Sequence, residues 1–570
     1  MIDDFFTDDK IIYYLCRVRA KYAKQRGKKH LLHLLSNNPE FNHHKEKRTL
    51  DEVLLKHVLP SRRKWKKLGK EYRYKNGQKI NSVEYNTKCI YKTIKYYQKN
   101  LPEEPFLNEL NKFILEIKTA INNPEYKIQK PIIYPKLKGK QCFTGDINVC
   151  RPISLYTLKD KIIISQTNKY LTKKFDSEFY EFSHAFRAPK KGEELITHHN
   201  SIAELLKYRN RFKDVDLWVA ECDMQKFYDS VGHSIIKRQF KYMVDRTGAI
   251  DERAIGLFYK FLDSYNFIED VLPKNDDSEY WKTFKIVNGE FGWVKKELIE
   301  HKHYDNLMFE KIGVPQGGAL SGLIANIVLD YADSILTKAG DDELLYLRFC
   351  DDMIVLHPNK DTCSQFVQNY NKVLLQLKLV PHKFESNLTN DSDSFWNSKS
   401  KSPYKWAMDY ETEYSFPWIG FVGYEIHCNG FIRVRKSSLK KEFLKQKELV
   451  ESIKKAIKTN KKARNGTVVE SAINRLVGMS VGRVHMYNHK NIVADMCWVN
   501  GFKELNSNPY LKKQLKYLDK NRNHQIARLE KEVSKYEDPK FEYDDKAPNR
   551  KLVYYGKPYS YYHQVTKKKE

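Results

Sequence analysis

Two adjacent carboxylates lie between two apolar runs in the middle of the sequence. Asp351 and Asp352 follow Tyr346-Leu-Arg-Phe-Cys350 and precede Met353-Ile-Val-Leu356. This pattern predicts two strands joined by a sharp turn, with both acids at its tip. Two like charges side by side repel each other, and a divalent cation would neutralise them. Taken alone, the pair also fits an ordinary solvated hairpin.

A third acid, Asp223, ends the apolar run from Leu217 to Cys222, which we expect to be a strand. Three carboxylates favour Mg²⁺, with Mn²⁺ as the alternative, because both ions prefer oxygen ligands. Two such ions can activate a 3′ hydroxyl and stabilise a pyrophosphate leaving group during in-line displacement. The acids therefore predict two-metal nucleotidyl transfer, provided that the fold brings them together.

A glycine-rich turn, Gly313-Val-Pro-Gln316-Gly-Gly318, lies between these acids and runs into an apolar segment that predicts a helix. Without side chains, the backbone can approach a base pair or a phosphate closely. The segment is not a Walker A loop, because no Gly-Lys-Ser/Thr ends it. By itself such a turn is weak evidence.

Together, in this order and spacing, the three elements resemble the palm motifs of reverse transcriptases, in particular the group II intron, retron and defence-associated lineage of bacteria. Four further segments resemble the finger, group II, lysine and primer-grip motifs of these enzymes: Arg151-Pro-Ile-Ser with Asp160-Lys-Ile-Ile, Ser183-His-Ala-Phe-Arg187, Leu377 to Lys383, and Phe421-Val-Gly-Tyr424. The resemblance covers roughly residues 130 to 435. It implies an α+β right-hand polymerase fold and RNA-directed DNA polymerase activity.

The resemblance also implies roles for single residues. Asp223, Asp351 and Asp352 would hold two Mg²⁺ ions, with the Met224 carbonyl as a further donor. The residues expected to bind the incoming dNTP are Arg151 with Lys136 or Lys138 at the triphosphate, Gln316 beside the base pair, Tyr228 beneath the ribose, and Lys383 as an acid near the pyrophosphate. Phe421, Gly423 and Tyr424 would grip the primer. The alternative for each of the basic residues is an ordinary surface cation.

The hairpin departs from the family pattern next to its acids. Phe349 stands where a tyrosine is usual, and Cys350 stands where a small residue is usual. We expect this change to affect fidelity or processivity more than the chemistry.

The charge of the chain points to a polyanionic partner. There are 101 Lys and Arg against 72 Asp and Glu, a formal net charge of +29. The 38 tyrosines would suit base stacking beside phosphate contacts. We therefore expect an RNA template and a cDNA product as partners, although a merely basic surface would have the same composition.

The composition and hydrophobic patterning of successive segments predict four regions. These are a helical, basic N-terminal extension (1–125), fingers and palm (126–430), a helical thumb and C-terminal region (431–534), and a Tyr- and Lys-rich tail (535–570). Residues 61–80 carry nine Lys or Arg against one Glu, and residues 431–470 carry thirteen against four, with Ser437 as a helix start. Both stretches read as RNA-binding or as solvated helix faces.

The cysteine pattern and the amino terminus argue against zinc-binding, disulfide-stabilised, secreted and membrane-spanning proteins. The nine cysteines are scattered singly, which argues against structural zinc and against a disulfide framework. The amino terminus is acidic, and no apolar run approaches the ~18 residues that span a bilayer. We expect a cytoplasmic, bacterial protein that contacts no membrane.

The branch within the family is inferred from motifs that the sequence lacks. The paired cysteines and histidines of an intron-type endonuclease are absent, as are the thumb elements typical of retron enzymes. The defence-associated branch remains, and the tail resembles class 9, which implies a structured noncoding RNA, an oligomer and homopolymeric cDNA. Retron-type enzymes, intron maturases and a non-catalytic RNA-binding protein stay as alternatives.

The tail holds five tyrosines within nine residues, Tyr554, Tyr555, Tyr559, Tyr561 and Tyr562. Little apolar content surrounds them, so we expect them to be unburied. A tyrosine hydroxyl can be a nucleophile when activated, so one of them could prime synthesis in place of a 3′ hydroxyl. The alternative is a stacking or docking strand.

Overall fold

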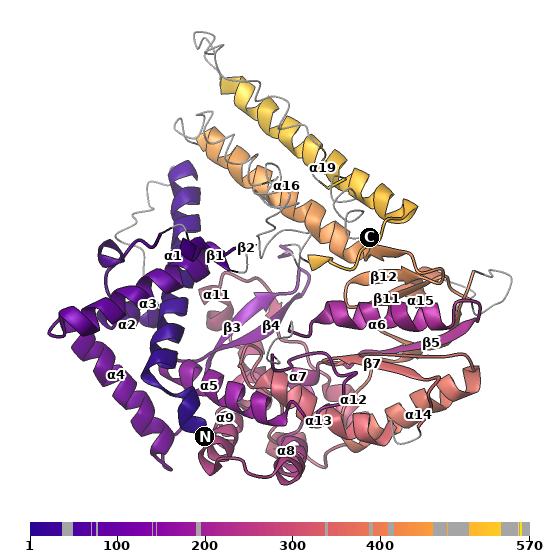
Figure 1. Cartoon of the computed structure of the whole chain (residues 1–570). Helices are drawn as coiled ribbons and strands as arrows, with labels where there is room; N and C mark the ends of the chain where they lie inside the picture. The colour runs from indigo at the N-terminus through magenta and orange to yellow at the C-terminus, as the bar shows by residue number, and fades with distance from the viewer. Residues whose placement is uncertain are drawn as a thin grey trace. The chain divides into compact units, whose positions relative to one another are not determined.

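The computed structural model describes residues 1–36, 49–69, 71–75, 78–139, 141–143, 145–189, 195–336, 340–386, 392–408, 415–459, 473, 476, 501–536, 557, 559 and 560 (Figure 1). The chain divides into two compact units. The first comprises Met1–Ile11 and Ile114–Val422, and the second comprises Ile12–Phe113 and Gly423–Glu570. Helices α1 (Asp8–Ser36) and α4 (Pro105–Asn122) run across the two boundaries in the N-terminal part.

A five-stranded sheet in the order β7-β8-β5-β10-β9 forms the centre of the first unit. Its strands are β5 (Leu217–Cys222), β7 (Leu345–Phe349), β8 (Asp352–His357), β9 (Phe384–Glu385) and β10 (Ser400–Trp406). All neighbours are antiparallel except β9 and β10. Strands β5 and β8 are buried along almost their whole length, as expected for apolar runs covered on both faces.

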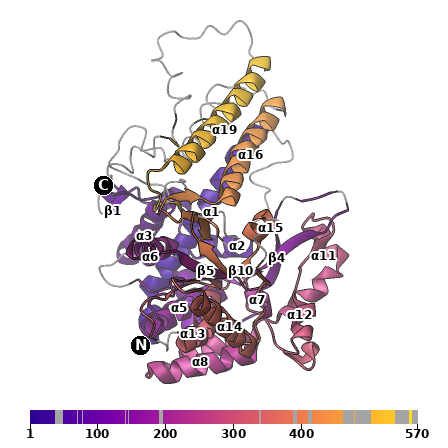
Figure 2. The same ribbon diagram turned by 90° about the vertical axis from the view of Figure 1, so that its right-hand side faces the viewer.

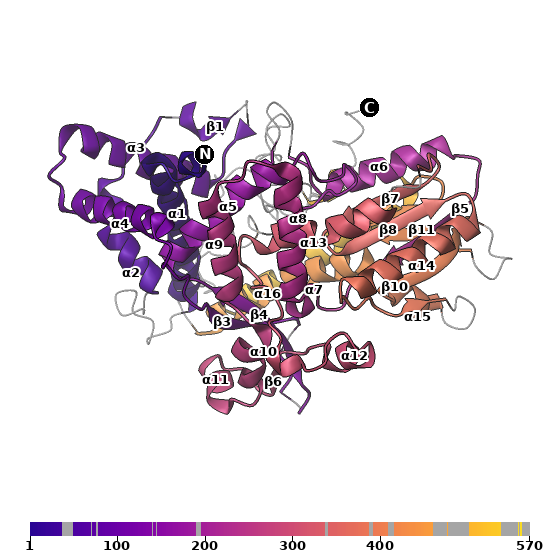
Figure 3. The same ribbon diagram turned by 90° about the horizontal axis from the view of Figure 1, so that it is seen from below.

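Helices pack against this sheet and build the rest of the palm. Helix α14 (Lys360–Gln376) lies along β8, β5 and β10, as Figure 3 shows, and α6 (His198–Arg211) packs against β7. Helix α13 (Ser321–Leu336) packs against α14 and α8 (His233–Thr247). Asn359 caps α14 by accepting from the amides of the first turn.

A second sheet, in the order β3-β4-β6, forms the finger hairpin. Strand β3 (Ile132–Leu137) pairs antiparallel with β4 (Asn148–Leu155), and β6 (Gly289–Glu290) pairs parallel with β4. The remaining elements of this unit are α5 (Leu158–Phe175), α7 (Phe227–Ser230), α9 (Glu252–Asp263), α10 (Phe267–Asp270), α11 (Ser278–Thr283), α12 (Lys295–Glu300), α15 (Ser392–Asn397) and β11 (Trp418–Phe421).

The second unit is mainly helical. Its elements are α2 (Leu50–His57), the short strands β1 (Tyr74–Lys75) and β2 (Gln78–Lys79), α3 (Ser82–Asn100), β12 (Tyr424–His427), β13 (Ile432–Val434), α16 (Lys436–Thr459) and α19 (Pro509–Val533). Helices α16 and α19 lie side by side (Figures 1 and 2). They bury an apolar seam that includes Val450, Ile457, Ile526 and Leu529.

The prediction of an α+β fold is confirmed. The region expected to begin a helix at Ser437 does so at Lys436, and the part of the predicted basic segment beyond residue 459 lies outside the described residues. The basic stretch 61–80 contains short 3-10 turns and the β1-β2 pair. Within the described ranges, no helix is long and apolar enough to cross a membrane.

Candidate active site

Strand register brings the three predicted acids to one edge of the central sheet. Cys222 of β5 lies opposite Met353 of β8, so Asp223, which follows Cys222, faces the position of Asp352. Phe349 of β7 pairs with Asp352, which leaves Cys350 and Asp351 as the two-residue turn. Burial, and then the charges of all three acids, raise the pKa of the Cys222 thiol. The register thus brings the backbone positions of the three acids to the same edge of the sheet.

The turn of the hairpin is held by a buried arginine. Cys350 has φ 63°, the left-handed value that tight hairpin turns need. Arg348, which is fully buried, donates from Nη1 to the Cys350 carbonyl at 3.1 Å and pairs through Nε with Asp333 of α13 at 2.9 Å. Arg348 also donates to Ser183 Oγ at 2.8 Å. The hairpin that carries Asp351 and Asp352 is therefore tied to α13 and to the group II-like segment.

Electrostatics at the sheet edge favour a bound cation. Burial, and next the nearby charge of Asp223, raise the pKa of Asp351, so the ionised acids repel each other. Asp223 Oδ2 already accepts from Lys399 Nζ at 2.8 Å. In the described part of the chain, no three His, Cys, Asp or Glu side chains form a ready-made metal cage. The donors are nevertheless all carboxylates, which is the set that Mg²⁺ prefers.

The lysine motif runs beside Asp223. The Gln225 amide donates to the Val380 carbonyl at 2.7 Å, and the His382 amide donates to the Asp223 carbonyl at 2.9 Å. Met224, the predicted carbonyl donor, is buried and bridges to Pro381. Lys383, which follows His382, is exposed. The backbone of this loop thus fixes the segment that carries Asp223.

The residues predicted to bind the nucleotide lie on the finger hairpin and the glycine-rich turn. Lys136 pairs with Arg151 across β3 and β4, and both side chains are exposed. Partial burial, then the charges of Lys226 and Arg151, lower the pKa of Lys138 to about 8. Gln316 accepts through its backbone from the Ser154 amide of β4 at 2.8 Å. The finger strand and the glycine-rich turn are therefore in contact.

A buried acid sits among these cations, and the sequence analysis missed it. Asp229 is 1% exposed and accepts from Gln316 Nε2 at 2.7 Å. Burial raises the pKa of Asp229 to about 6, although the charges of Lys226 and Lys138 oppose the rise. Its position six residues after Asp223, beyond the aromatic pair, was the only available signal. Lys226 was missed as well, and so was Lys399, whose partner Asp223 is 176 positions away.

Tyr228 contacts both the glycine-rich turn and the turn formed by Cys350 and Asp351. Its carbonyl accepts from the Val314 amide at 2.7 Å, and its hydroxyl is 3.0 Å from Cys350 Sγ. The ring is only half-buried, whereas the preceding Phe227 is buried in the core. The predicted sugar-sensing residue is therefore next to the turn that carries Asp351.

The finger-motif residues have structural partners. Asp160 is fully buried and accepts from Thr157 Oγ1 at 2.7 Å and from the Tyr126 hydroxyl. Arg187, also buried, pairs with Asp176 at 2.9 Å. These residues support the fold around the site.

The primer-grip residues fall on both sides of the boundary between the two units. Phe421 is buried in the first unit. Val422 and Gly423 both have positive φ, 39° and 92°, so Gly423 occupies a position where glycine is favoured. In the second unit Tyr424 is fully buried, and its ring packs at 5.4 Å on Phe502. Phe421 and Tyr424 are thus core residues of their own units.

The expectation that the tail tyrosines are unburied is wrong for Tyr559. Its side chain is 1% exposed, and its hydroxyl donates to Glu442 Oε1 at 2.8 Å and accepts from Gln446 Nε2 at 2.9 Å. The amides of Tyr559 and Ser560 donate to the two oxygens of Asp519 at 2.9 and 2.8 Å. Polar partners on α16 and α19, rather than an apolar core, account for the burial. Tyr554, Tyr555, Tyr561 and Tyr562 lie outside the described residues.

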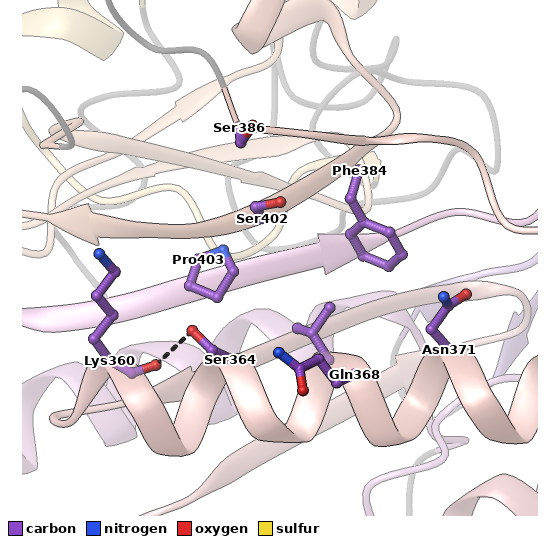
Figure 4. A pocket seen from close by; sticks show the side chains of 9 residues that line it. Lys360, Ser364, Gln368, Asn371, Phe384, Ser386, Ser402 and Pro403 are labelled. Carbon is purple, nitrogen blue, oxygen red and sulfur yellow. Dashed lines mark hydrogen bonds between the residues drawn. The ribbon is translucent and has the colours of Figure 1, made fainter.

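A pocket of about 420 Å³ lies elsewhere, between α14 and the strands β9 and β10 (Figure 4). Lys360, Gln368, Phe384 and Ser402 are among its lining residues. None of the predicted site residues lines it.

Comparison with known proteins gives the family of the central region. Residues 138–395, less than half of the chain, match the family model "Reverse transcriptase (RNA-dependent DNA polymerase)". The putative COX1/OXI3 intron 1 protein of Saccharomyces cerevisiae is 24% identical over 227 residues, which are 40% of this chain and 20% of that protein. Protein YkfC of Escherichia coli is 22% identical over 237 residues, 41% and 50% of the two chains. The chain spans half or less of the length of these relatives.

Among solved structures, apo telomerase from Candida tropicalis matches at 16% identity, with a TM-score of 0.33, over 79% of this chain and 74% of that one. Telomerase from Candida albicans in complex with a fragment of telomeric RNA matches at 14% identity, with a TM-score of 0.32, over 80% and 71%. The family match covers all three acids and the glycine-rich turn, and the predicted polymerase fold is confirmed. Residues 138–395 therefore form a reverse transcriptase domain, the domain of RNA-directed DNA polymerases.

Proposed function

We propose that the chain is an RNA-directed DNA polymerase that makes cDNA by two-metal nucleotidyl transfer. The observation that carries this proposal is the register of β5, β8 and β7, which gathers Asp223, Asp351 and Asp352 at one sheet edge. Retention of all three acids argues against the alternative of a non-catalytic RNA-binding protein on a polymerase fold.

In this proposal the three acids and the Met224 carbonyl hold two Mg²⁺ ions. When bound, such ions activate the attacking hydroxyl and neutralise the departing pyrophosphate. Arg151, Lys136 and Lys138 bind the triphosphate through charge-assisted hydrogen bonds. The other proposed contacts of the nucleotide and primer are Gln316 with the base pair, Tyr228 with the ribose, Lys383 with the pyrophosphate, and Phe421, Gly423 and Tyr424 with the primer.

Primer extension tests the activity directly. Purified protein should extend a DNA primer on an RNA template with dNTPs and Mg²⁺, and Asp351→Asn with Asp352→Asn should abolish extension, because amides supply no charge to the ions. The matched control is Asp342→Asn with Glu343→Gln, an adjacent exposed pair just before β7 that should extend normally. Extension by the Asp351/Asp352 double variant at the wild-type rate would overturn the assignment.

We further propose that this polymerase acts in bacterial antiviral defence, in the cytoplasm, with a structured noncoding RNA as template and as a homo-oligomer of the class 9 type. The support is the sequence of the tail and the absence of an intron-type endonuclease motif. Sequencing the RNA and cDNA that copurify with the chain tests this proposal. A single noncoding RNA with homopolymeric cDNA would support it, and phage plating on cells with wild-type or metal-site variant protein would test defence.

An intron-linked role is the second candidate, because one relative is an intron-encoded protein by name. In that case the copurified RNA would be a self-splicing intron. A retron-type enzyme would instead yield cDNA joined to its own RNA. The same sequencing experiment separates the three.

We also propose that a tail tyrosine primes synthesis, with Tyr554, Tyr555, Tyr559, Tyr561 and Tyr562 as the candidates. Tyr559 could act only after leaving Glu442 and Gln446. Mass spectrometry after nuclease and protease digestion should find a nucleotide on one of these residues. If cDNA migrates free of protein under denaturing conditions, the tail is not the primer.

The division into an N-terminal extension (1–125), fingers and palm (126–430), thumb (431–534) and tail (535–570) is retained as a proposal for the functional regions. A truncated variant that ends at residue 534 would test it, because it should keep polymerisation on an external primer and lose self-priming.

A further inference from the structure

Cys350 contacts both the proposed sugar-sensing tyrosine and the catalytic turn. Its Sγ lies 3.0 Å from Tyr228 Oη, and its backbone forms the turn together with Asp351. The side chain is 8% exposed, so little water competes for its contact with the phenol.

The position of the thiol is fixed by its backbone. Cys350 is the first residue of a two-residue turn and has φ 63°. Its carbonyl accepts from Arg348 Nη1 at 3.1 Å, and Arg348 is anchored on Asp333 at 2.9 Å. A non-glycine residue in this conformation is strained, and the network holds it in place. The sulfur thus presents a stationary partner to Tyr228.

Tyr228 is consequently held at both ends. Its carbonyl accepts from Val314 of the glycine-rich turn at 2.7 Å, and its hydroxyl meets Cys350. Its half-buried ring packs edge-on against Phe227 at 5.4 Å. A ring that is fixed at its backbone and at its hydroxyl can move aside less easily than one held only at its backbone.

We propose that Cys350 is a specificity-determining residue, whose thiol clamps the Tyr228 ring and so sharpens the exclusion of ribonucleotides. This inference rests on the proposed role of Tyr228 beneath the incoming ribose. Without the clamp, the ring can tilt away from a 2′ hydroxyl, and discrimination between dNTP and rNTP falls. Cys350 acts here through Tyr228 and is a positioning residue.

The test compares the ratio of kcat/KM for dNTP to kcat/KM for the matching rNTP in four variants. Cys350→Ala and Tyr228→Phe each remove one side of the contact, and each should lower the ratio by about two- to ten-fold, the range for one hydrogen bond. The double variant should lose no more than either single one, since the contact is already gone. Cys350→Ser, which keeps a hydroxyl partner, should retain most of the ratio.

Cys363→Ala is the matched control, because Cys363 is a buried thiol of α14 outside the site, and its ratio should equal that of wild type. Tyr228→Ala separates the two proposals. If it loses discrimination while Cys350→Ala and Tyr228→Phe do not, the clamp is refuted and the tyrosine's role stands. If Tyr228→Ala leaves the ratio unchanged, both are refuted. Additive losses in the double variant would also refute the clamp. If Cys350→Ala fails to fold, the ratio measured for Tyr228→Phe decides the question by itself.

Discussion

The ion pair between Arg348 and Asp333 supports the hairpin that carries Asp351 and Asp352. The variant Arg348→Met measures how much this pair contributes to the free energy of unfolding. Both side chains are at most 1% exposed. Arg348 Nη1 also donates to Asn326 Oδ1 at 3.2 Å and to the Cys350 carbonyl at 3.1 Å. Methionine fills a similar volume but donates no hydrogen bond. The variant therefore leaves the Asp333 carboxylate buried without its guanidinium.

Removing one partner of a buried ion pair costs about 3 to 5 kcal/mol. With a urea m-value of about 3 kcal/mol/M, the unfolding midpoint should fall by roughly 1 to 2 M. Single-turnover nucleotide addition should also slow, because the Cys350 carbonyl loses its donor and the turn that carries Asp351 is no longer fixed.

Urea unfolding of the metal-free protein is the assay. Lys282→Met is the control, because its pair with Glu279 is 69% and 78% exposed and should contribute less than about 1 kcal/mol. Arg348→Met with Asp333→Leu removes both charges and should regain most of the lost stability. A midpoint for Arg348→Met within about 0.3 M of wild type would refute the reasoning, as would a double variant no more stable than the single one.

Three further predictions follow from charge. Without metal, Asp351→Asn with Asp352→Asn should unfold at the same urea concentration as wild type or higher, because burial and then repulsion by Asp223 raise the pKa of Asp351, and the amide carries no charge to be penalised. A clear loss of stability would contradict this. Asp229 has a pKa of about 6 against about 4 when unfolded, so the folded state holds this proton more tightly. The stability of wild type relative to Asp229→Asn should therefore fall by up to about 3 kcal/mol as the pH rises from 4 to 7, and a constant difference would refute it. RNA affinity should drop steeply with salt, and neutralising lysines within 61–80 or 431–470 should flatten that slope in filter binding, whereas an affinity indifferent to salt would exclude phosphate contacts.

The centre of the site was predictable because its signals are local. Apolar strands around Asp351 and before Asp223 specify a hairpin and a strand end, and the glycines of the turn specify where backbone comes close. The structure keeps each of these elements. Sequence reasoning works where neighbouring residues along the chain determine the geometry.

The partners of these residues were not predictable, because strand pairing joins distant segments. Lys399 meets Asp223 across β10 and β5, whose register places residue 401 opposite residue 221. Asp229 is paired with Gln316, 87 positions away. Tyr559 was misjudged for a related reason. Its burial depends on Glu442 and Asp519, so a low apolar content around it carried no information.

Tyr559 joins the two long helices of its unit through a single residue. Its hydroxyl contacts Glu442 and Gln446 on α16, and its backbone amide contacts Asp519 on α19. Any event that draws Tyr559 out of this position therefore breaks hydrogen bonds to both helices at once. Reaction at the Tyr559 hydroxyl and the packing of α16 against α19 are coupled in this way.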